Sequence, residues 1–498
     1  MFGKVLIANR GEIAVRLIRC CRKLGIRSVA VFSEADRAAL HLRFADEAYC
    51  IGPPPAGDSY LNIARIIEVA RRSGAHAVHP GYGFLSESPT FAAACEQAGI
   101  TFIGPPPAAM EALGSKTASR VLAGRLGVPL IPGTGLLADA ELPAAAEALG
   151  YPVVVKAAAG GGGKGMRVVH APADLDGAAR AARSEGQAAF GSDALYLEKY
   201  LLAPRHVEVQ VLADTTGETI ALGDRDCSVQ RRHQKVIEEA PALGLSDSLR
   251  RTLWDAAVTL ATAAGYVTAG TCEFLVTADG RYYFLEANPR LQVEHPVTEL
   301  VTGLDLVEAQ LRIAAGEPLR LTPDDCRPRG HALECRIYAE DPFRGFTPCP
   351  GRVQHLREPG GPGVRLDSGI YEGYEVPGHY DPLIAKLCTW GRDRGEAVAH
   401  MARALQEYSV QGLATTIPFH RRVMADPRFQ AGPVDTTYLD THFPDRPHAW
   451  DEAARSVALI AAALHAAREA ARRPAARAGA GESPWVLAAR QAAVRRGA

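Results

Sequence analysis

Short apolar runs alternate with amphipathic stretches along the first 112 residues. Residues 4–8, 27–33, 75–79 and 100–103 are rich in β-branched residues and predict strands. Residues 12–26 show apolar positions at helical spacing and predict a helix that ends near Gly25. This alternation predicts a parallel α/β sheet. The segment HPGYGFLSE, residues 79–87, follows a predicted strand, where open α/β sheets place ligands.

A Pro/Gly-rich boundary at residues 129–135 separates this region from a compact segment at 131–203. There the pattern predicts helices over 141–150 and 173–185 and strands over 152–157, 166–171 and 195–201, which together suggest a small lid domain. Residues 204–446 open with strands over 205–214 and 219–228 and carry most of the polar motifs. The predicted division of the chain is 1–112, 113–203, 204–332, 333–446 and an Ala/Arg-rich tail, 447–498.

Composition and charge exclude several classes of protein. The chain has 498 residues, enough for roughly three domains, and a formal net charge of −1, so no bulk field attracts nucleic acid or an anionic membrane. No run of 18 apolar residues occurs, and the first residues turn polar too soon for a secretory signal. The ten cysteines form no CxxC pair, which favours reduced thiols in the cytoplasm.

The glycine-rich segment at 160–165 predicts a phosphate-binding loop. It matches GxGxxG, but MRVVH follows and predicts a strand, so the loop joins two strands and is not a dinucleotide fingerprint. The Walker A pattern also fails, because Met166 follows Gly165. Lys156 and Lys164 flank the loop, in a chain where eight of 55 basic residues are lysine. Backbone N–H groups of such a hairpin can fold over a polyphosphate.

Residues 271–290 predict a hairpin that brings two carboxylates together. With Asp279-Gly280 as a two-residue turn, Leu275 pairs with Phe284 and Glu273 with Glu286. Like charges in a cross-strand pair are unfavourable unless a cation bridges them, and Asn288 projects to the same face. Two carboxylates and an amide oxygen suit Mg²⁺. The alternative is a pair of solvated surface glutamates.

A cluster of oxyanion-binding and basic groups follows this hairpin. Arg290, Gln292 and Glu294 alternate, so on an extended segment they share a face and form a site for a small oxyanion beside a carboxylate base. The earlier segment RDCSVQRRHQKVIEEAP supplies Gln230, His233 and Lys235. Each of these residues alone is typical of a surface loop.

Eight motifs in this order resemble the biotin carboxylase component of biotin-dependent carboxylases: IANRGEIA, HPGYGFLSE, KAAAGGGGKGMR, EKYL, RDCSVQRRHQK, EANPRLQVEHPVTE, ECRIYAED and YDPLIAKL. The resemblance covers residues 2–446. It implies an ATP-grasp fold with a Rossmann-like N-terminal domain, a small lid domain and a C-terminal domain of α+β character. It also implies carboxylation of biotin by MgATP (or MnATP) and bicarbonate, through carboxyphosphate.

The resemblance also implies roles for individual residues. The implied ATP-binding residues are Lys116, Lys156, Gly162, Gly163, Glu198, Lys199, Tyr200, Leu201, His206, Gln230, His233, Glu273, Leu275 and Glu286. The implied metal ligands are Glu273, Glu286 and Asn288. Bicarbonate binding is implied for Lys235, Arg290, Gln292 and the backbone of Val293. Glu294 is the implied general base and Arg336 the residue that binds the biotin enolate, with Arg290 and Lys235 also in the catalytic set.

The partners implied are a separate biotin carboxyl carrier protein, carboxyltransferase subunits and a second copy in a homodimer. Acetyl-CoA or another acyl-CoA is the expected final acceptor, with pyruvate as the alternative. No AMKM motif occurs, and Lys386 is the only lysine after Lys235, so we expect no biotin on this chain.

Other functions fit the sequence less well. Another ATP-grasp ligase would share the loop and the metal hairpin, but not Arg290, Gln292, Glu294 and Arg336 together. A regulatory nucleotide-binding subunit would have lost catalytic positions. The helical pattern from Trp450 to Arg473 predicts either a helix packed on the C-terminal domain or a docking element.

Overall fold

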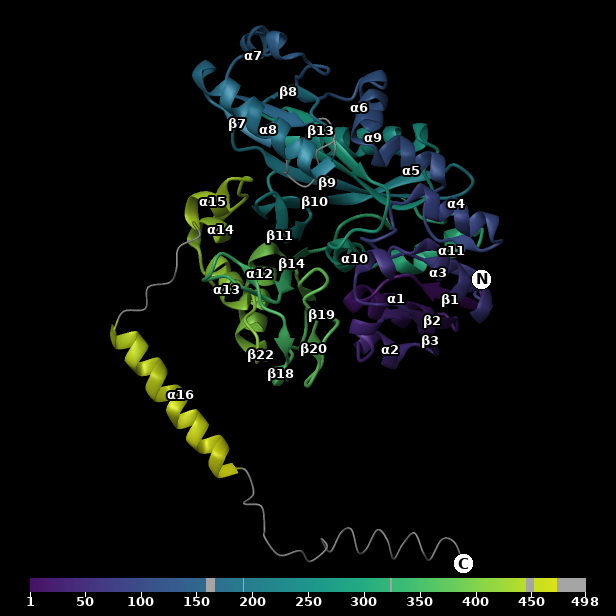
Figure 1. The fold of residues 1–498 in the computed structure, drawn as a ribbon, viewed down its shortest axis with the longest axis vertical. Helices are drawn as coiled ribbons and strands as arrows, with labels where there is room; N and C mark the ends of the chain where they lie inside the picture. The colour runs from purple at the N-terminus through teal and green to yellow at the C-terminus, as the bar shows by residue number, and fades with distance from the viewer. Residues whose placement is uncertain (158–165, 191, 323–324, 445–451, 473–498) are drawn as a thin grey trace, which may run out of the picture. The chain divides into compact units, whose positions relative to one another are not determined.

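The computed structural model describes residues 1–157, 166–190, 192–322, 325–444 and 452–472 (Figure 1). The chain forms two compact units, Met1–Arg446 and Pro447–Ala498, and each is described by itself. The predicted loop residues Gly162, Gly163 and Lys164 lie outside the described residues.

The N-terminal part is a parallel sheet, as the alternating pattern predicts. Its strands are β1 (Lys4–Ile7), β2 (Arg27–Ser33), β3 (Glu47–Gly52), β4 (Ala77–His79) and β5 (Thr101–Phe102), in the order β3-β2-β1-β4-β5. The helices of this region are α1 (Gly11–Lys23), α2 (Leu40–Phe44), α3 (Ile63–Ser73), α4 (Pro89–Gln97), α5 (Pro107–Gly114) and α6 (Lys116–Arg125). The edge strand β3 was not predicted, because exposed and half-buried residues dominate it and leave Ile51 as its one buried side chain.

The segment predicted as a lid is a small antiparallel sheet in the order β7-β6-β8. Its elements are α7 (Leu142–Leu149), β6 (Val153–Ala157), β7 (Met166–Val169), α8 (Leu175–Phe190) and β8 (Leu195–Lys199). Strands β6 and β7 pair directly, so the glycine-rich segment connects the two strands of a hairpin, as the MRVVH pattern predicts.

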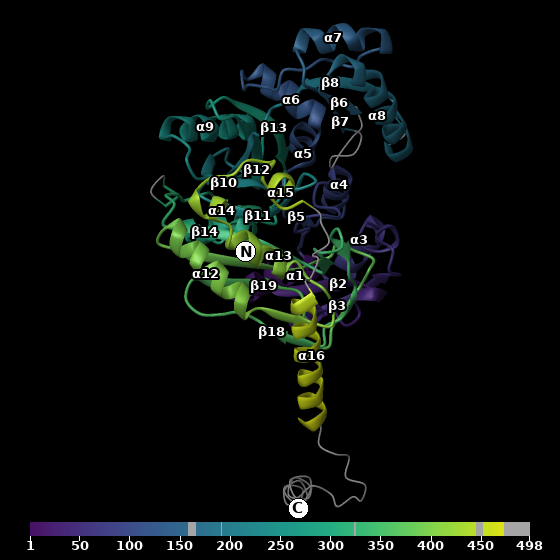
Figure 2. The same ribbon diagram turned by 90° about the vertical axis from the view of Figure 1, so that its left-hand side faces the viewer.

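A long antiparallel sheet forms the centre of the larger unit (Figure 2). Its order is β13-β12-β9-β10-β11-β14-β21-β19. The strands are β9 (Arg205–Ala213), β10 (Thr219–Arg231), β11 (Gln234–Ala240), β12 (Thr268–Val276), β13 (Tyr282–Asn288), β14 (His331–Tyr338), β19 (Val364–Ser368) and β21 (Leu383–Gly391). The sheet therefore continues from the segment predicted at 204–332 into the one predicted at 333–446.

Shorter elements complete this unit. The helices are α9 (Asp247–Ala263), α10 (His295–Thr302), α11 (Leu306–Ala314), α12 (Arg394–Glu407), α13 (Ile417–Met424), α14 (Pro427–Ala431) and α15 (Tyr438–His442). The short strands are β15 (Glu340–Asp341), β16 (Thr347–Pro348), β17 (Gly351–Arg352), β18 (His355–Arg357), β20 (Glu375–Val376) and β22 (Ser409–Gln411). In the second unit, α16 (Glu452–Arg472) matches the predicted helix, with Val457, Ile460 and Leu464 at 60–66% exposure. No helix among the described residues has the length and hydrophobicity needed to cross a membrane.

The β12–β13 hairpin differs from the prediction near its turn. Phe274 pairs with Phe284 and Leu275 with Tyr283, so the predicted Leu275–Phe284 pair was wrong. The turn is longer than two residues, because Thr277 bonds across to Arg281 and the Asp279 carboxylate accepts from the Thr277 hydroxyl. A register shift between Phe274 and Glu273 restores the predicted pairing of Glu273 with Glu286.

Candidate active site

Lys235 stands at the centre of a buried charge cluster on the long sheet. It follows the turn between β10 and β11, where Arg232 and His233 have φ of 50° and 64° and Arg231 pairs with Gln234. Lys235 Nζ lies 2.5 Å from Glu208 Oε2, 2.8 Å from Glu273 Oε1 and 2.7 Å from Glu294 Oε1. The cluster thus joins β9, β11, β12 and the segment before α10.

Burial alone would raise the pKa of these carboxyl groups, but the surrounding cations outweigh it. The charges of Arg225 and Lys235 lower the pKa of Glu208 to about 2. Lys235 and His206 hold the pKa of Glu273 well below its ordinary value. The pKa of Glu294 is also lowered, against burial and the charge of Glu208, by Lys235, Arg336 and Arg225. Glu294 is therefore ionised at neutral pH and can accept a proton.

A second cation reaches Glu294 from the neighbouring strands. Arg336, on β14, donates from Nη2 to Glu294 Oε2 over 2.9 Å and from Nε to Glu238 Oε1 over 2.6 Å. Glu238 lies on β11 and is fully buried. Glu294 is thus held between Lys235 and Arg336, and Glu238 fixes the direction of the Arg336 guanidinium.

The predicted oxyanion segment is a turn rather than a strand. Arg290 N–H donates to the Asn288 carbonyl, and Glu294 precedes α10, where Pro296 occupies the first turn. The expectation that Arg290, Gln292 and Glu294 alternate on one extended face was wrong. Arg290 Nη1 still contacts Gln292 Oε1 at 3.1 Å, and its Nε lies 2.9 Å from Glu87 of the HPGYGFLSE segment.

The carboxylates predicted to bind metal are paired across β12 and β13. Asn288 Nδ2 lies 2.6 Å from Glu273 Oε1, and His206 Nε2 lies 2.6 Å from Glu273 Oε2. Glu286 forms an ion pair with Lys116, 2.9 Å away. Two carboxylates and an amide on adjacent strands, with the ammonium of Lys116 beside Glu286, fit a divalent cation that also binds phosphate oxygens.

Two other groups of possible ligand atoms occur among the described residues: His206 with Glu208 and Glu273, and Glu208 with Cys227 and Glu294. Both include carboxylates that already contact the Lys235 ammonium. Glu273 of the predicted set Glu273, Glu286 and Asn288 contacts the same ammonium, so this contact does not separate the three sets, and the predicted metal site stays a prediction.

The remaining predicted nucleotide residues lie along the lid and the neighbouring strands. Glu198, on β8, is buried and forms ion pairs with Arg120 and Lys156. Lys199 Nζ donates to the carbonyls of Gly150 and Tyr151. Tyr200 and Leu201 follow β8 and are half-buried, as is Leu275 on β12. Gln230 Nε2 contacts His206 Nδ1 at 2.5 Å, whereas His233 is exposed at the hairpin turn.

Sequence reasoning missed Glu208, Arg225 and Glu238. Arg225 is fully buried and donates to Glu208, Gln210 and Thr298. Glu208 and Gln210 interrupt a run of valines on β9, a strand buried along nearly its whole length. A charged residue inside such an apolar run is the signal that could have found them, because an unpaired charge is rarely buried.

Three family descriptions match consecutive parts of the chain. They are "Biotin carboxylase, N-terminal domain" over residues 1–110, "Carbamoyl-phosphate synthase L chain, ATP binding domain" over 115–322 and "Biotin carboxylase C-terminal domain" over 334–441. The middle match is the one that another ATP-grasp ligase would share, and the two flanking matches separate the chain from such ligases.

Similar proteins cover the same residues. A pyruvate carboxylase subunit of Methanothermobacter thermautotrophicus is 52% identical over 89% of this chain and 90% of its own length. Biotin carboxylase of Pseudomonas aeruginosa is 52% identical over 88% of this chain and 98% of its own.

Among solved structures, a biotin carboxylase nucleotide complex from Campylobacter jejuni has a TM-score of 0.85 and 46% identity, covering 89% of this chain and 99% of that one. The biotin carboxylase domain dimer of Hydrogenobacter thermophilus 2-oxoglutarate carboxylase, with MgADP and bicarbonate, has a TM-score of 0.85 and 48% identity over 89% and 98% of the two chains. The chain belongs to the biotin carboxylase family, with the ATP-grasp fold, and is a ligase that carboxylates biotin at the expense of ATP.

Proposed function

We propose that this chain carboxylates biotin on a separate carrier protein, using the residues gathered around Lys235. In the first step bicarbonate oxygen attacks the γ-phosphoryl group of ATP, forming carboxyphosphate and ADP, while Glu294 accepts the bicarbonate proton. The observation that carries this proposal is the position of Glu294, ionised and held between Lys235 and Arg336.

The bicarbonate site in this proposal is formed by Lys235, Arg290, Gln292 and the backbone of Val293. Arg290 is supported by contacts to Gln292 and Glu87, which fix its guanidinium beside the turn before Glu294. A guanidinium and an ammonium on one side of a small oxyanion neutralise its charge and orient it for attack.

We place the nucleotide between the lid and the strands β12 and β13. Lys116 and Lys156 contact phosphates, and Gly162 and Gly163, which lie outside the described residues, stay predicted phosphate-binding residues. The adenine is bordered by Glu198, Lys199, Tyr200 and Leu201. The nucleoside lies beside His206, Gln230 and Leu275, and the phosphates lie near His233. Glu273, Glu286 and Asn288 hold Mg²⁺ or Mn²⁺, which when bound neutralises charge on the transferring phosphoryl group. The salt bridge between Lys116 and Glu286 supports a common site for phosphate and metal.

In the second stage carboxyphosphate breaks into CO₂ and phosphate, and phosphate removes the proton from the ureido nitrogen of biotin. Arg336 binds the enolate oxygen that forms, and the nitrogen attacks CO₂ to give carboxybiotin. The Glu238 carboxylate supports this role because it fixes the Arg336 guanidinium in a buried position.

The partners follow from this reaction. A biotin carboxyl carrier protein supplies biotin, and carboxyltransferase subunits pass the carboxyl group on, with acetyl-CoA or another acyl-CoA as acceptor or, alternatively, pyruvate. The Hydrogenobacter thermophilus structure is a dimer, which supports a homodimer here. Cytoplasmic location, the absence of membrane and nucleic-acid partners and the division at residues 112, 203, 332 and 446 stay predictions.

The test compares Glu294→Gln with Glu308→Gln, a matched change on the helix α11 outside the site. Bicarbonate-dependent ATP hydrolysis in the presence of free biotin should fall about 10²–10⁴-fold in Glu294→Gln, the usual contribution of proton transfer. ATP binding should stay near that of the wild type, and Glu308→Gln should keep its rate. A Glu294→Gln enzyme with wild-type turnover would remove Glu294 from the mechanism.

A further inference from the structure

Lys386 is a buried lysine that the roles above do not use. It lies on β21, its side chain is 0% exposed, and it pairs in register with Arg336 on β14 and with Asp367 on β19. Register partners project to the same face of a sheet, so Lys386 lies beside the arginine that contacts Glu294. Burying an ammonium is costly unless it is paired and hydrogen-bonded, so its contacts identify what it does.

The nearest acceptor of this ammonium is a backbone carbonyl of the bicarbonate segment. Lys386 Nζ donates to Val293 O over 2.9 Å, and Val293 directly precedes Glu294. The preceding carbonyl, of Gln292, accepts from His295 Nδ1 over 2.7 Å. Consecutive peptide units of this turn are therefore fixed by side chains from β21 and α10.

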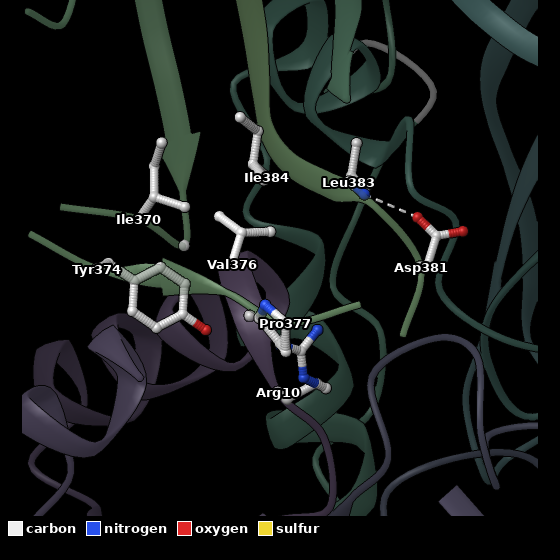
Figure 3. A pocket seen from close by; sticks show the side chains of 10 residues that line it. Arg10, Ile370, Tyr374, Val376, Pro377, Asp381, Leu383 and Ile384 are labelled. Carbon is white, nitrogen blue, oxygen red and sulfur yellow. Dashed lines mark hydrogen bonds between the residues drawn. The ribbon is translucent and has the colours of Figure 1, made fainter. Parts of the chain in front are cut away.

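Lys386 also joins this turn to the N-terminal part of the chain. Its Nζ lies 3.4 Å from Glu12 Oε2 at the start of α1 and 5.5 Å from the centre of the Tyr82 ring in HPGYGFLSE. The start of α1 packs tightly here, because a Cβ on Gly369 would come within 2.7 Å of the Glu12 backbone nitrogen. Figure 3 shows a small cavity beside this junction, lined by Arg10, which lies next to Pro377, and by Leu383 and Ile384 of β21.

The simplest alternative is a structural ion pair between Lys386 and Glu12. Two observations favour the carbonyl instead. The Glu12 oxygen is farther from Nζ than the Val293 oxygen, at 3.4 Å against 2.9 Å. In addition, neither carboxylate oxygen of Glu12 accepts a hydrogen bond from the described residues, whereas the Val293 oxygen accepts one from Lys386 Nζ.

We propose that Lys386 is a positioning residue, which holds the Val293 carbonyl and thereby the bicarbonate-binding backbone of Val293 and the carboxylate of Glu294. This inference rests on the roles proposed above for Val293 and Glu294. Without the lysine, the peptide before Glu294 loses its buried donor and is free to turn, which misplaces the bicarbonate while the nucleotide residues on β8, β12 and β13 keep their contacts.

The test uses Lys386→Met together with the charge-balanced double variant Glu12→Gln/Lys386→Met. The single variant leaves Glu12 without its cation and is expected to be less stable, whereas the double variant removes both charges and regains thermal stability. In both, KM for bicarbonate should rise about 10-fold or more, as for loss of one hydrogen bond from a charged donor, with KM for ATP within about two-fold. Glu12→Gln alone should keep the wild-type KM for bicarbonate, because the bond to Val293 remains.

A double variant with wild-type KM for bicarbonate would overturn the proposal and leave the ion pair as the whole role of Lys386. A parallel rise of both KM values would also overturn it, since general distortion affects both substrates. Glu294→Gln is measured alongside: if it keeps turnover, the base assignment fails, and the bicarbonate KM of the double variant still decides the role of Lys386.

Discussion

Replacing Lys235 by Met tests the central charge cluster most severely. The change leaves Glu208, Glu273 and Glu294 buried without the ammonium that each of them contacts at 2.5–2.8 Å. Each carboxylate keeps another partner among the described residues, Arg225, His206 or Arg336, so the losses do not simply add. Breaking a buried ion pair typically costs about 3–5 kcal/mol, and we expect the loss in unfolding free energy to lie in that range at pH 7.

The pH dependence of this loss follows from the pKa values. In the wild type the pKa of Glu208 is about 2 and those of Glu273 and Glu294 are lowered, so all three stay ionised at pH 5. Without Lys235, burial raises their pKa values, and the folded variant takes up protons before the unfolded chain does. The variant is then stabilised relative to the wild type as pH falls, so the deficit should shrink between pH 7 and pH 5.

The assay is urea unfolding of both proteins at the two pH values. The slope and midpoint of each transition give the free energy of unfolding. Lys23→Met is the matched control, because Lys23 pairs with Asp305 and Glu308 at the surface and should contribute about 0–1 kcal/mol. A Lys235→Met protein as stable as the control variant, or a deficit that is equal at both pH values, would refute this account of the cluster.

Three further predictions concern other residues. Burial would raise the pKa of Asp36, but the hydrogen bonds and charge of Arg10 and the hydrogen bond of the Tyr60 hydroxyl outweigh it, so the pKa is lowered. The ionised Asp36 therefore stabilises the fold at pH values above its ordinary pKa, and this stabilisation is lost as pH falls. The melting temperature of the wild type should therefore drop more steeply from pH 5 to pH 3 than that of Asp36→Asn, and parallel curves would contradict this. Arg336→Met should lower turnover with free biotin about 10²–10³-fold without changing KM for ATP; an unchanged rate would exclude Arg336 as the enolate-binding group. When the chain is expressed with a biotin ligase, its intact mass should show no added biotin, because Lys386 is buried. A biotinylated protein would contradict the expectation that this chain carries no biotin.

Local patterns predicted much of the fold because they depend on neighbouring residues. The parallel N-terminal sheet, the β6–β7 hairpin and α16 follow from periodicity and from the strand pattern after the glycines. The cross-strand pair Glu273–Glu286 was also predicted, although the turn beside it was not two residues long. The longer turn depends on the side-chain bonds of Thr277 and Asp279, and the register shift between Glu273 and Phe274 has no signal in the hydrophobic pattern.

The rest of the site depends on contacts between residues far apart in the chain. Glu208 and Lys235 are brought together by strand order, and Glu238 meets Arg336 because β11 and β14 are neighbours. The turn from Arg290 to Glu294 is shaped by a helix that starts at His295, so alternation of polar residues gave the wrong geometry there. No pattern in the sequence indicates that Lys386, more than 90 residues away, reaches the Val293 carbonyl.

The most direct test of the whole account is transfer of carbon from labelled bicarbonate to free biotin by the purified chain. We predict label on the ureido nitrogen of biotin that requires ATP, Mg²⁺ and bicarbonate together, with ADP and phosphate released in step. Hydrolysis of ATP without any label on biotin, at the same rate with and without bicarbonate, would contradict the proposed reaction.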